Sequence, residues 1–227
     1  MNRFAPILAA LAAVAVLVAG AWWYFSRPAP SIGTAQPAAA AGTDQPATGA
    51  AAEVPAMWIG NPEAKVRVVE YASFTCPHCR HFHETVFGEL EHNYIAPGKI
   101  RFELREVYFD RYGLWAAMLA RCDGSAEKYF GIVDLIFRRQ REWTSGESDE
   151  QIIQNLYRLG RAAGLTDEKM DACLHDQDMA EKLVAAFQEN VTRDGVNATP
   201  TFFVNGVKHS NMGYAEFARI LDEALAN

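Results

Sequence analysis

Hydrophobic and polar positions recur with a period that changes along the chain, and these changes predict its elements. Residues 66–74 form a β-branched and aromatic run that is largely apolar, as in a central strand covered on both faces. Over residues 76–94 the apolar positions return with helical spacing until Pro97-Gly98. Residues 100–108 alternate apolar and charged side chains. This alternation predicts a second strand, parallel to the first through the crossover helix.

A long helical block follows, and strand character returns near the end of the chain. The period is helical over about 112–193. Residues 201–209 have the pattern of a hairpin whose strands meet at Asn205-Gly206. An amphipathic helix over 214–226 closes the chain. The order β-α-β, helical block, β-β-α predicts an α/β fold with an inserted all-helical domain. Helix starts are expected at Ser125, Ser148 or Asp149, Thr166 and Asp178.

The N-terminal residues have the composition of an export segment. Residues 7–25 are apolar without interruption, and a helix of that length approaches the roughly 30 Å thickness of a bilayer. We therefore expect residues 1–27 to direct export. They form either an uncleaved membrane anchor or a signal peptide that is cut near the small residues 19–21. Both alternatives export the rest of the chain.

Composition separates a linker from a folded domain. Residues 28–57 are dominated by Ala, Pro, Gly and Thr and cannot bury a core, so we expect a flexible linker there and a folded domain over 58–227. The whole chain is 50% hydrophobic and 22% charged, which is ordinary globular composition. Its net charge is -7 and its basic residues are scattered. We therefore expect no nucleic-acid partner.

The candidate chemistry lies in Cys76-Pro77-His78-Cys79, at the junction of the first strand and the first helix. There the sulfur of Cys76 faces unsatisfied helix N–H groups and the positive end of the helix dipole, which favour the thiolate. Cys76 is therefore the expected nucleophile, and Cys79, one turn further in, is placed to resolve a mixed disulfide. Pro77 costs no hydrogen bond in the first turn. His78 would add to thiolate stabilisation.

Two other interpretations of this cysteine pair remain open. The pair could form a structural disulfide, although its position at a helix terminus argues against one. It could also supply half of a zinc or copper site together with nearby histidines. A structural zinc site needs four converging ligands, and a second pair at ordinary spacing is missing. We therefore expect neither a metal nor a cofactor, and interpret His81 and His83 as exposed or half-buried helix residues.

Two further positions complete the candidate site. Glu70 lies six residues before Cys76 inside an apolar strand. Burial would favour its protonated form and let it accept and return the proton that Cys79 exchanges, whereas a solvated strand end would give it no such role. Thr199-Pro200 precedes the predicted hairpin, where a proline is unusual unless it caps the sheet edge.

These motifs together resemble the bacterial DsbA family of thiol oxidases, over about residues 60–225. The resemblance rests on Glu70, on the Cys-Pro-His-Cys sequence, on Thr199-Pro200-Thr201-Phe202 and on Asn205-Gly206. It implies a thioredoxin fold with a helical insertion. A low pKa of the nucleophilic cysteine and a strongly oxidising disulfide are known properties of that family rather than results from this sequence.

The resemblance also implies roles for the site residues. Cys76 would be the exposed nucleophile, Cys79 its partner, and Glu70 the buried acid. Thr199 and a cis Pro200 would form the loop that faces the disulfide, binds substrate backbone and keeps metal away from the cysteines. His78 would tune the potential.

A physiological role and its alternatives follow from the same resemblance. Such a protein is expected to be a periplasmic monomer that oxidises cysteines in exported proteins and is reoxidised by a quinone-coupled membrane thiol oxidase. An isomerase or reductase is the alternative within this chemistry, although such proteins are usually dimeric through an added N-terminal domain, and this linker is short. A periplasmic metal-binding module is the alternative outside it.

A second cysteine pair distinguishes this chain from the best-known members and resembles an alphaproteobacterial branch of the family. If Cys76 pairs with Cys79, then Cys122 and Cys173 are left to form a structural disulfide in an oxidising compartment. Two buried free thiols are the alternative.

Overall fold

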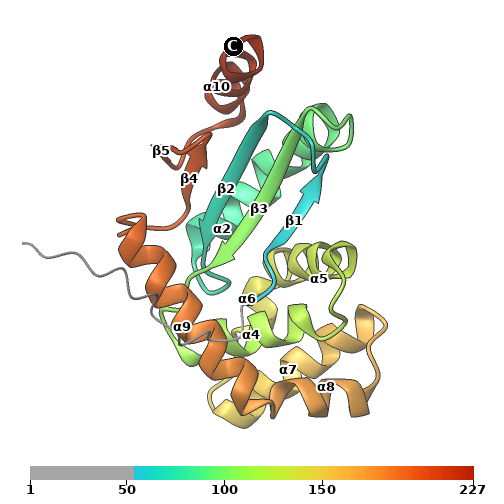
Figure 1. The fold of residues 1–227 in the computed structure, drawn as a ribbon. Coiled ribbons are helices and arrows are strands. Elements are labelled where there is room, and N and C mark those ends of the chain that lie inside the picture. Colours follow the sequence, from blue (N-terminus) through green and yellow to red (C-terminus); the bar gives the residue numbers. More distant parts are fainter. Residues whose placement is uncertain (1–53) are drawn as a thin grey trace, which may run out of the picture. The chain divides into compact units, whose positions relative to one another are not determined.

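The computed structural model describes residues 54–227, in which five strands form one mixed sheet (Figure 1). The strand order is β1-β3-β2-β4-β5, with β2 parallel to β3 and the other pairs antiparallel. The strands are β1 Met57–Gly60, β2 Val66–Ala72, β3 Ile100–Glu106, β4 Thr201–Val204 and β5 Val207–Ser210. Strand β2 therefore lies at the centre, and its carboxyl end leads directly into the cysteine pair.

Alternation along β2 assigns its side chains to two faces. Val66, Val68, Glu70 and Ala72 are buried on one face, whereas Arg67 on the other face is exposed. In the register, Glu70 lies beside residues of both neighbouring strands, Leu104 and Phe202. The polar residue therefore sits in the middle of the sheet, on the face that carries the apolar core.

A helical segment and the C-terminal helix cover that apolar face. The segment runs through α2 Pro77–Phe82, η1 His83–Phe87, α3 Gly88–Leu90 and η2 Glu91–Ile95, where η1 and η2 are π-helical. Helix α10 spans Tyr214–Ala226. Phe202 of β4 packs 4.6 Å from Phe82 and 4.9 Å from Phe217 of α10, measured between ring centroids. Burial of each such ring stabilises the fold by about 1.5–3 kcal/mol.

Six helices lie between β3 and β4. They are α4 Arg111–Arg121, α5 Ala126–Arg138, α6 Gln140–Trp143, α7 Asp149–Ala162, α8 Asp167–Leu174 and α9 Gln177–Arg193. Five of them begin at a side chain that accepts a backbone N–H, which satisfies one of the free donors of the first turn. These caps are Asp110, Ser125, Ser148, Thr166 and Asp176. The predicted α/β order with inserted helices is confirmed.

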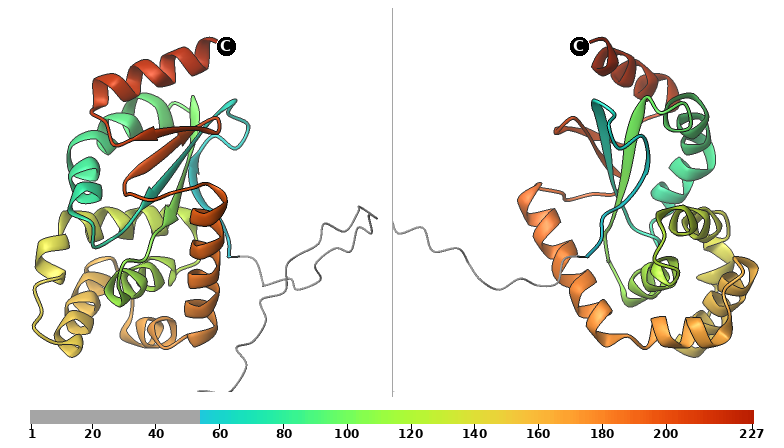
Figure 2. Two further views of the ribbon diagram at one scale, coloured as in Figure 1. Left: turned by 90° about the vertical axis from the view of Figure 1, so that its left-hand side faces the viewer. Right: turned by 45° about the vertical axis from the view of Figure 1, so that its right-hand side comes forward.

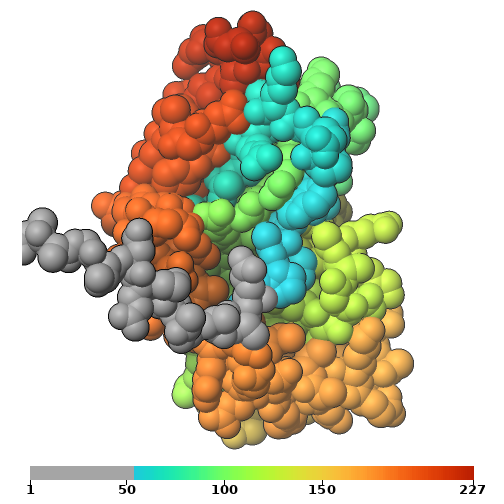
Figure 3. Space-filling model, viewed as in Figure 1, coloured from blue at the N-terminus to red at the C-terminus, as the bar shows by residue number. Residues whose placement is uncertain are grey.

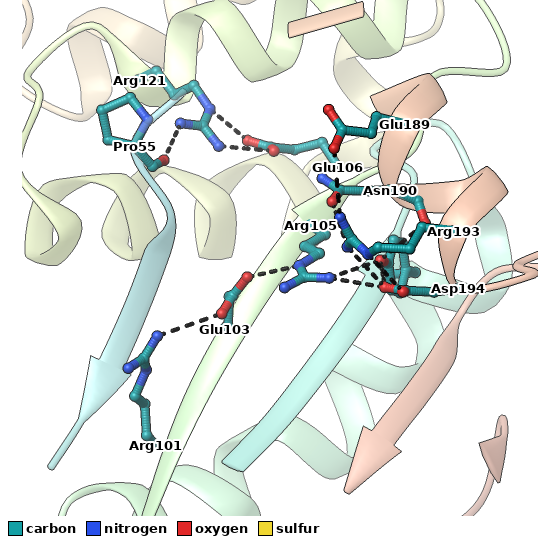
Figure 4. A network of polar contacts seen from close by, with 11 residues as sticks. Pro55, Arg101, Glu103, Arg105, Glu106, Arg121, Glu189, Asn190, Arg193 and Asp194 are labelled. Carbon is teal, nitrogen blue, oxygen red and sulfur yellow. Dashed lines mark hydrogen bonds and ion pairs between the residues drawn. The ribbon is translucent and has the colours of Figure 1, made fainter. Parts of the chain in front are cut away.

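Helix α9 lies on the opposite side of the sheet from α2, and Figure 2 shows the two on either side of the strands. A cavity of about 740 Å³ is lined by residues of α9 and of the strands. In Figure 3, atoms coloured as β3 are visible between the cyan and the orange parts of the chain. Arg105 of β3 binds Glu103 at 2.7 Å and Asp194 at the end of α9 at 2.9 Å, while Arg121 of α4 binds Glu106 at 2.7 Å (Figure 4). None of the four cysteines lines this cavity.

The structure differs from the sequence expectations in local details. The sequence pattern does not predict strand β1, and its first residue, Met57, is 4% exposed and belongs to the folded domain rather than to the expected linker. Helix α9 is capped by Asp176 rather than Asp178.

Within residues 54–227, no helix combines the length and apolarity needed to cross a bilayer. The expected export segment, residues 1–27, lies outside the described residues.

Candidate active site

The cysteine pair lies where β2 ends and α2 begins. Cys76 is the N-cap residue in an extended conformation, Pro77 opens the helix, and the backbone N–H of Arg80 donates to the Cys76 carbonyl at 3.2 Å. Both cysteines are reduced. Cys76 is 8% exposed and Cys79 is fully buried, while Pro77 and His78 are exposed. Within the part of the chain that the structure describes, solvent therefore reaches Cys76 but not Cys79.

Local hydrogen bonds lower the pKa of Cys76 from its ordinary value of 9.0 to about 5. The largest cause is the hydrogen bond from the Cys79 thiol, and burial acts in the opposite direction. The Thr199 side chain and the backbone N–H groups of Cys79 and His78 lower the pKa further because they stabilise the thiolate. With a pKa of about 5, about 99% of Cys76 is thiolate at pH 7.

The environment of Cys79 has the opposite effect on its thiol. Burial raises the pKa of Cys79 far above its ordinary value, and the hydrogen bond to Cys76 and the charge of Glu70 raise it further. One sulfur is thus held as an anion and the other as a thiol. This division is what a nucleophile and a buried leaving group require.

The Thr199-Pro200 segment lies against the pair. Its peptide bond is cis, and the Cys76 sulfur lies 3.6 Å from the Thr199 carbonyl oxygen, which the thiol form donates to. The Thr199 hydroxyl is buried and has no other hydrogen-bond partner among the described residues, and its hydrogen bond to the thiolate is one of the causes that lower the pKa of Cys76. The predicted neighbours of the cysteine pair are therefore brought together across 123 residues of sequence.

Two residues associated with the helical insertion support the active-site turn, and the sequence analysis did not identify them. The side-chain amide of Gln140, which is 4% exposed, donates to the carbonyls of Phe74 at 2.8 Å and Cys76 at 2.9 Å. Asp110, which caps α4, accepts from the hydroxyl of Thr75 at 2.7 Å. The backbone on both sides of the nucleophile is therefore fixed from outside the β-α unit that carries it.

Glu70 is fully buried, and its partner is a residue that the sequence analysis had assigned no function. Glu70 Oε2 lies 2.9 Å from His83 Nε2, and the two side chains are 0% and 4% exposed. His83 lies four residues after Cys79, so the helix places both on one face, which is a signal that spacing alone could have supplied. His81, in contrast, is exposed.

The other two cysteines lie outside the candidate active site. Cys122, at the end of α4, and Cys173 of α8 are joined by a disulfide with 5.5 Å between their Cα atoms. Over residues 54–227, no three His, Cys, Asp or Glu side chains are grouped closely enough to hold a metal ion.

Comparison with known proteins places the chain in a family. A family model described as Thioredoxin matches residues 52–223. A putative protein-disulfide oxidoreductase of Rickettsia bellii is 34% identical over 169 residues, which cover 74% of this chain and 64% of that protein. The chain therefore spans less than two thirds of the length of this relative.

Two solved structures share the fold. The structure of Wolbachia pipientis alpha-DsbA1 has a TM-score of 0.71 at 28% identity and covers 75% of this chain and 91% of its own. A protein-disulfide isomerase from Novosphingobium aromaticivorans has a TM-score of 0.65 at 26% identity and covers 76% and 98%. These matches confirm the thioredoxin fold with its inserted helices. The chain belongs to the thioredoxin family, and within that family it is similar to the DsbA proteins.

Proposed function

We propose that this chain is a thiol-disulfide oxidoreductase that acts as a dithiol oxidase, introducing disulfide bonds into exported proteins through Cys76 and Cys79. The observation that carries this proposal is the unequal ionisation of the pair. The pKa of Cys76 is lowered to about 5, whereas that of the buried Cys79 is raised. A stabilised thiolate favours the reduced enzyme over its disulfide, so electrons flow from substrate thiols to the enzyme.

The proposed reaction begins with the Cys76-Cys79 disulfide. A substrate thiolate attacks Cys76 Sγ, a mixed disulfide forms, and Cys79 leaves with the electron pair and takes up a proton. A second substrate thiolate then attacks the substrate sulfur of the mixed disulfide. Cys76 leaves as the stabilised thiolate, and the substrate departs with its new disulfide. Two electrons are thereby transferred to the enzyme.

The neighbouring residues have supporting roles in this proposal. His78, exposed between the cysteines, and Pro77 tune the thiolate through the first helical turn. Thr199 and Pro200 bind substrate backbone beside Cys76, which the 3.6 Å approach of the Thr199 carbonyl supports. Glu70 is the buried acid that exchanges a proton with Cys79, and its effect on the pKa of Cys79 supports this role.

The location and partners belong to the same proposal. The apolar residues 7–25 support export, with the folded domain in the periplasm, either released or tethered to the inner membrane by an N-terminal helix. Reduced exported proteins are the substrates. A quinone-coupled membrane thiol oxidase accepts the electrons, and the chain acts as a monomer.

Trapping of mixed disulfides tests the proposed roles of the two cysteines. In Cys79→Ser, Cys76 can still attack a disulfide of an exported protein, but the Cys79 thiol that would release the mixed disulfide is absent, so Cys76 should remain joined to that protein in non-reducing gels. Cys76→Ser removes the nucleophile and should capture none. Equal capture by the two variants would contradict the assignment of nucleophile and resolver.

An isomerase is the second candidate, favoured by the similarity to the protein-disulfide isomerase of Novosphingobium aromaticivorans. The two activities separate when reduced and scrambled ribonuclease are supplied in parallel. An oxidase restores activity to the reduced substrate in the presence of an oxidant but leaves the scrambled one largely inactive. Faster recovery of the scrambled substrate would favour the isomerase.

A further inference from the structure

Glu70 of strand β2 and His83 of the helical segment that starts at the cysteine pair form a buried pair of ionisable side chains. Glu70 is fully buried in the central strand, and His83 Nε2 is 2.9 Å from Glu70 Oε2. The other carboxylate oxygen, Oε1, is buried and has no hydrogen-bond partner among the described residues. A buried polar atom without a partner is costly, and such atoms are rare outside strained or functional positions.

Aromatic side chains hold His83 in one orientation. Its ring stacks on Phe137 of α5 with 4.1 Å between centroids and 18° between planes, and lies 4.8 Å from the ring of Phe87. With its ring enclosed in this way, His83 cannot turn away from Glu70 without loss of packing. The imidazole thus fixes one carboxylate oxygen and leaves the other available.

The same helix links this pair to the resolving cysteine. His83 is four residues after Cys79, and its backbone N–H donates to the carbonyls of Cys79 and Arg80 at the start of the π-helical turn η1. Turns of this kind occur frequently at functional sites. The carboxylate of Glu70 is close enough to Cys79 for its charge to act on that thiol.

We propose that His83 is a positioning residue for thiol exchange: with Glu70 it forms a buried acid-base pair that supplies a proton to Cys79 and takes it back. This inference rests on the proposed function and adds to it a residue and a proton path. Glu70 alone would carry a proton on either oxygen. Because Oε2 is bound to the imidazole, exchange with sulfur occurs at Oε1.

The proton and electrons balance in each direction. During substrate oxidation the Cys76-Cys79 bond breaks, a bond from Cys76 to the substrate sulfur forms, and the electron pair remains on Cys79. The proton that Glu70 carries on Oε1 passes to that sulfur while Oε2 keeps accepting from the imidazole N–H of His83, and Glu70 then recovers a proton from solvent. When Cys79 attacks a mixed disulfide at Cys76, its proton returns to Oε1 and the partner thiolate leaves.

A reaction with oxidised glutathione separates the step that uses Cys76 from the step that uses Cys79. Reduced protein is mixed with oxidised glutathione at pH 7, quenched in acid and analysed by mass spectrometry. Formation of the glutathione adduct reports attack by Cys76, and its disappearance reports attack by Cys79. His83→Phe should leave the first rate within about 2-fold and slow the second at least 10-fold, since a positioned acid-base group contributes about 10²–10⁴-fold.

Three controls distinguish proton transfer from packing. His83→Gln can still donate to Glu70 Oε2 and should retain the second rate within about 3-fold. His81→Gln alters an exposed histidine of the same helix and should have no effect. In a Glu70→Gln background, His83→Phe should slow the second step less than 2-fold further, because the group through which it acts is already absent.

Each result decides the question. An unchanged second rate in His83→Phe, or the same slowing with and without Glu70, would overturn the proton path. Melting curves verify folding, and His83→Leu replaces His83→Phe in the same cycle if the latter does not fold. If wild-type Cys76 formed no adduct with glutathione, the proposed function and this inference would fall together.

Discussion

The ionisation of Cys76 makes the stability of the reduced protein depend on pH. Its pKa is about 5 in the folded protein and near its ordinary value of 9.0 once the chain unfolds. A group whose pKa is lowered by folding stabilises the folded state at high pH, and this contribution disappears as the pH falls through the folded value. Lowering the pH below 5 therefore protonates Cys76 and removes the stabilisation that its thiolate gives to the folded protein.

The size of the effect follows from the two pKa values. Each pKa unit corresponds to about 1.36 kcal/mol. At pH 7, two units above the folded pKa of about 5, the thiolate stabilises the reduced protein by about 2.7 kcal/mol. At pH 4 the contribution is close to zero, and above pH 9 it reaches its full value of about 5 kcal/mol, which corresponds to the whole four-unit shift.

Comparison with Cys76→Ser isolates this contribution. Both proteins are kept reduced by the same phosphine, so that the second disulfide is in the same state in each, and unfolding in urea is followed by tryptophan fluorescence from pH 4 to pH 8. The difference in unfolding free energy between wild type and Cys76→Ser should grow by about 2.7 kcal/mol between pH 4 and pH 7. A difference that stays constant over this range would refute the lowered pKa, as would a thiolate absorbance at 240 nm that titrates near pH 9.

Two further predictions concern the insertion. Replacing Cys122 and Cys173 by alanine opens a loop with a sequence separation of 51 residues and should lower the free energy of unfolding by about 4 kcal/mol in urea titrations, while the pKa of Cys76 stays near 5. A loss below about 1 kcal/mol would contradict the stabilising role of the Cys122-Cys173 disulfide. Gln140→Leu removes the donor from two buried carbonyls and should cost about 1–3 kcal/mol for each carbonyl left unsatisfied. Gln140→Glu is the matched variant, and its free energy of unfolding should be no higher than that of Gln140→Leu because a carboxylate cannot donate. A free energy of unfolding equal to that of wild type in both variants would refute the supporting role of the Gln140 amide.

Local patterns were sufficient for most elements of the fold. The hydrophobic run of β2, the Asn205-Gly206 turn and the amphipathic period of α10 are each set by neighbouring residues, and the turn has the positive φ angles, 48° and 85°, that such a pair favours. Strand β1 escaped prediction because four residues that end in Gly60 carry little pattern. Its pairing with β3 arises from tertiary structure alone.

The residues of the candidate site also fall into two groups, those that have a local sequence signal and those that do not. Cys76 and Cys79 are separated by two residues, so spacing and position at a helix start reveal them. Gln140 contacts a carbonyl 64 residues away, and its identity as a buried amide on a short helix carries no local signal. His83 lies 13 residues from Glu70, and the sequence predicts only an exposed or half-buried helix residue, because it does not show that α5 covers this face with Phe137.

The approach of Thr199 to Cys76 has a consequence for synthesis. A nascent chain reaches the cysteine pair 123 residues before it reaches Thr199, and 64 residues before Gln140. Until both have been made, Cys76 lacks the hydroxyl that stabilises its thiolate and the amide that fixes its carbonyl. We therefore expect an incomplete polypeptide to carry Cys76 as a more ordinary thiol, which reacts more slowly with the cysteines of other unfolded chains. The reactive centre is completed by the last fifth of the sequence.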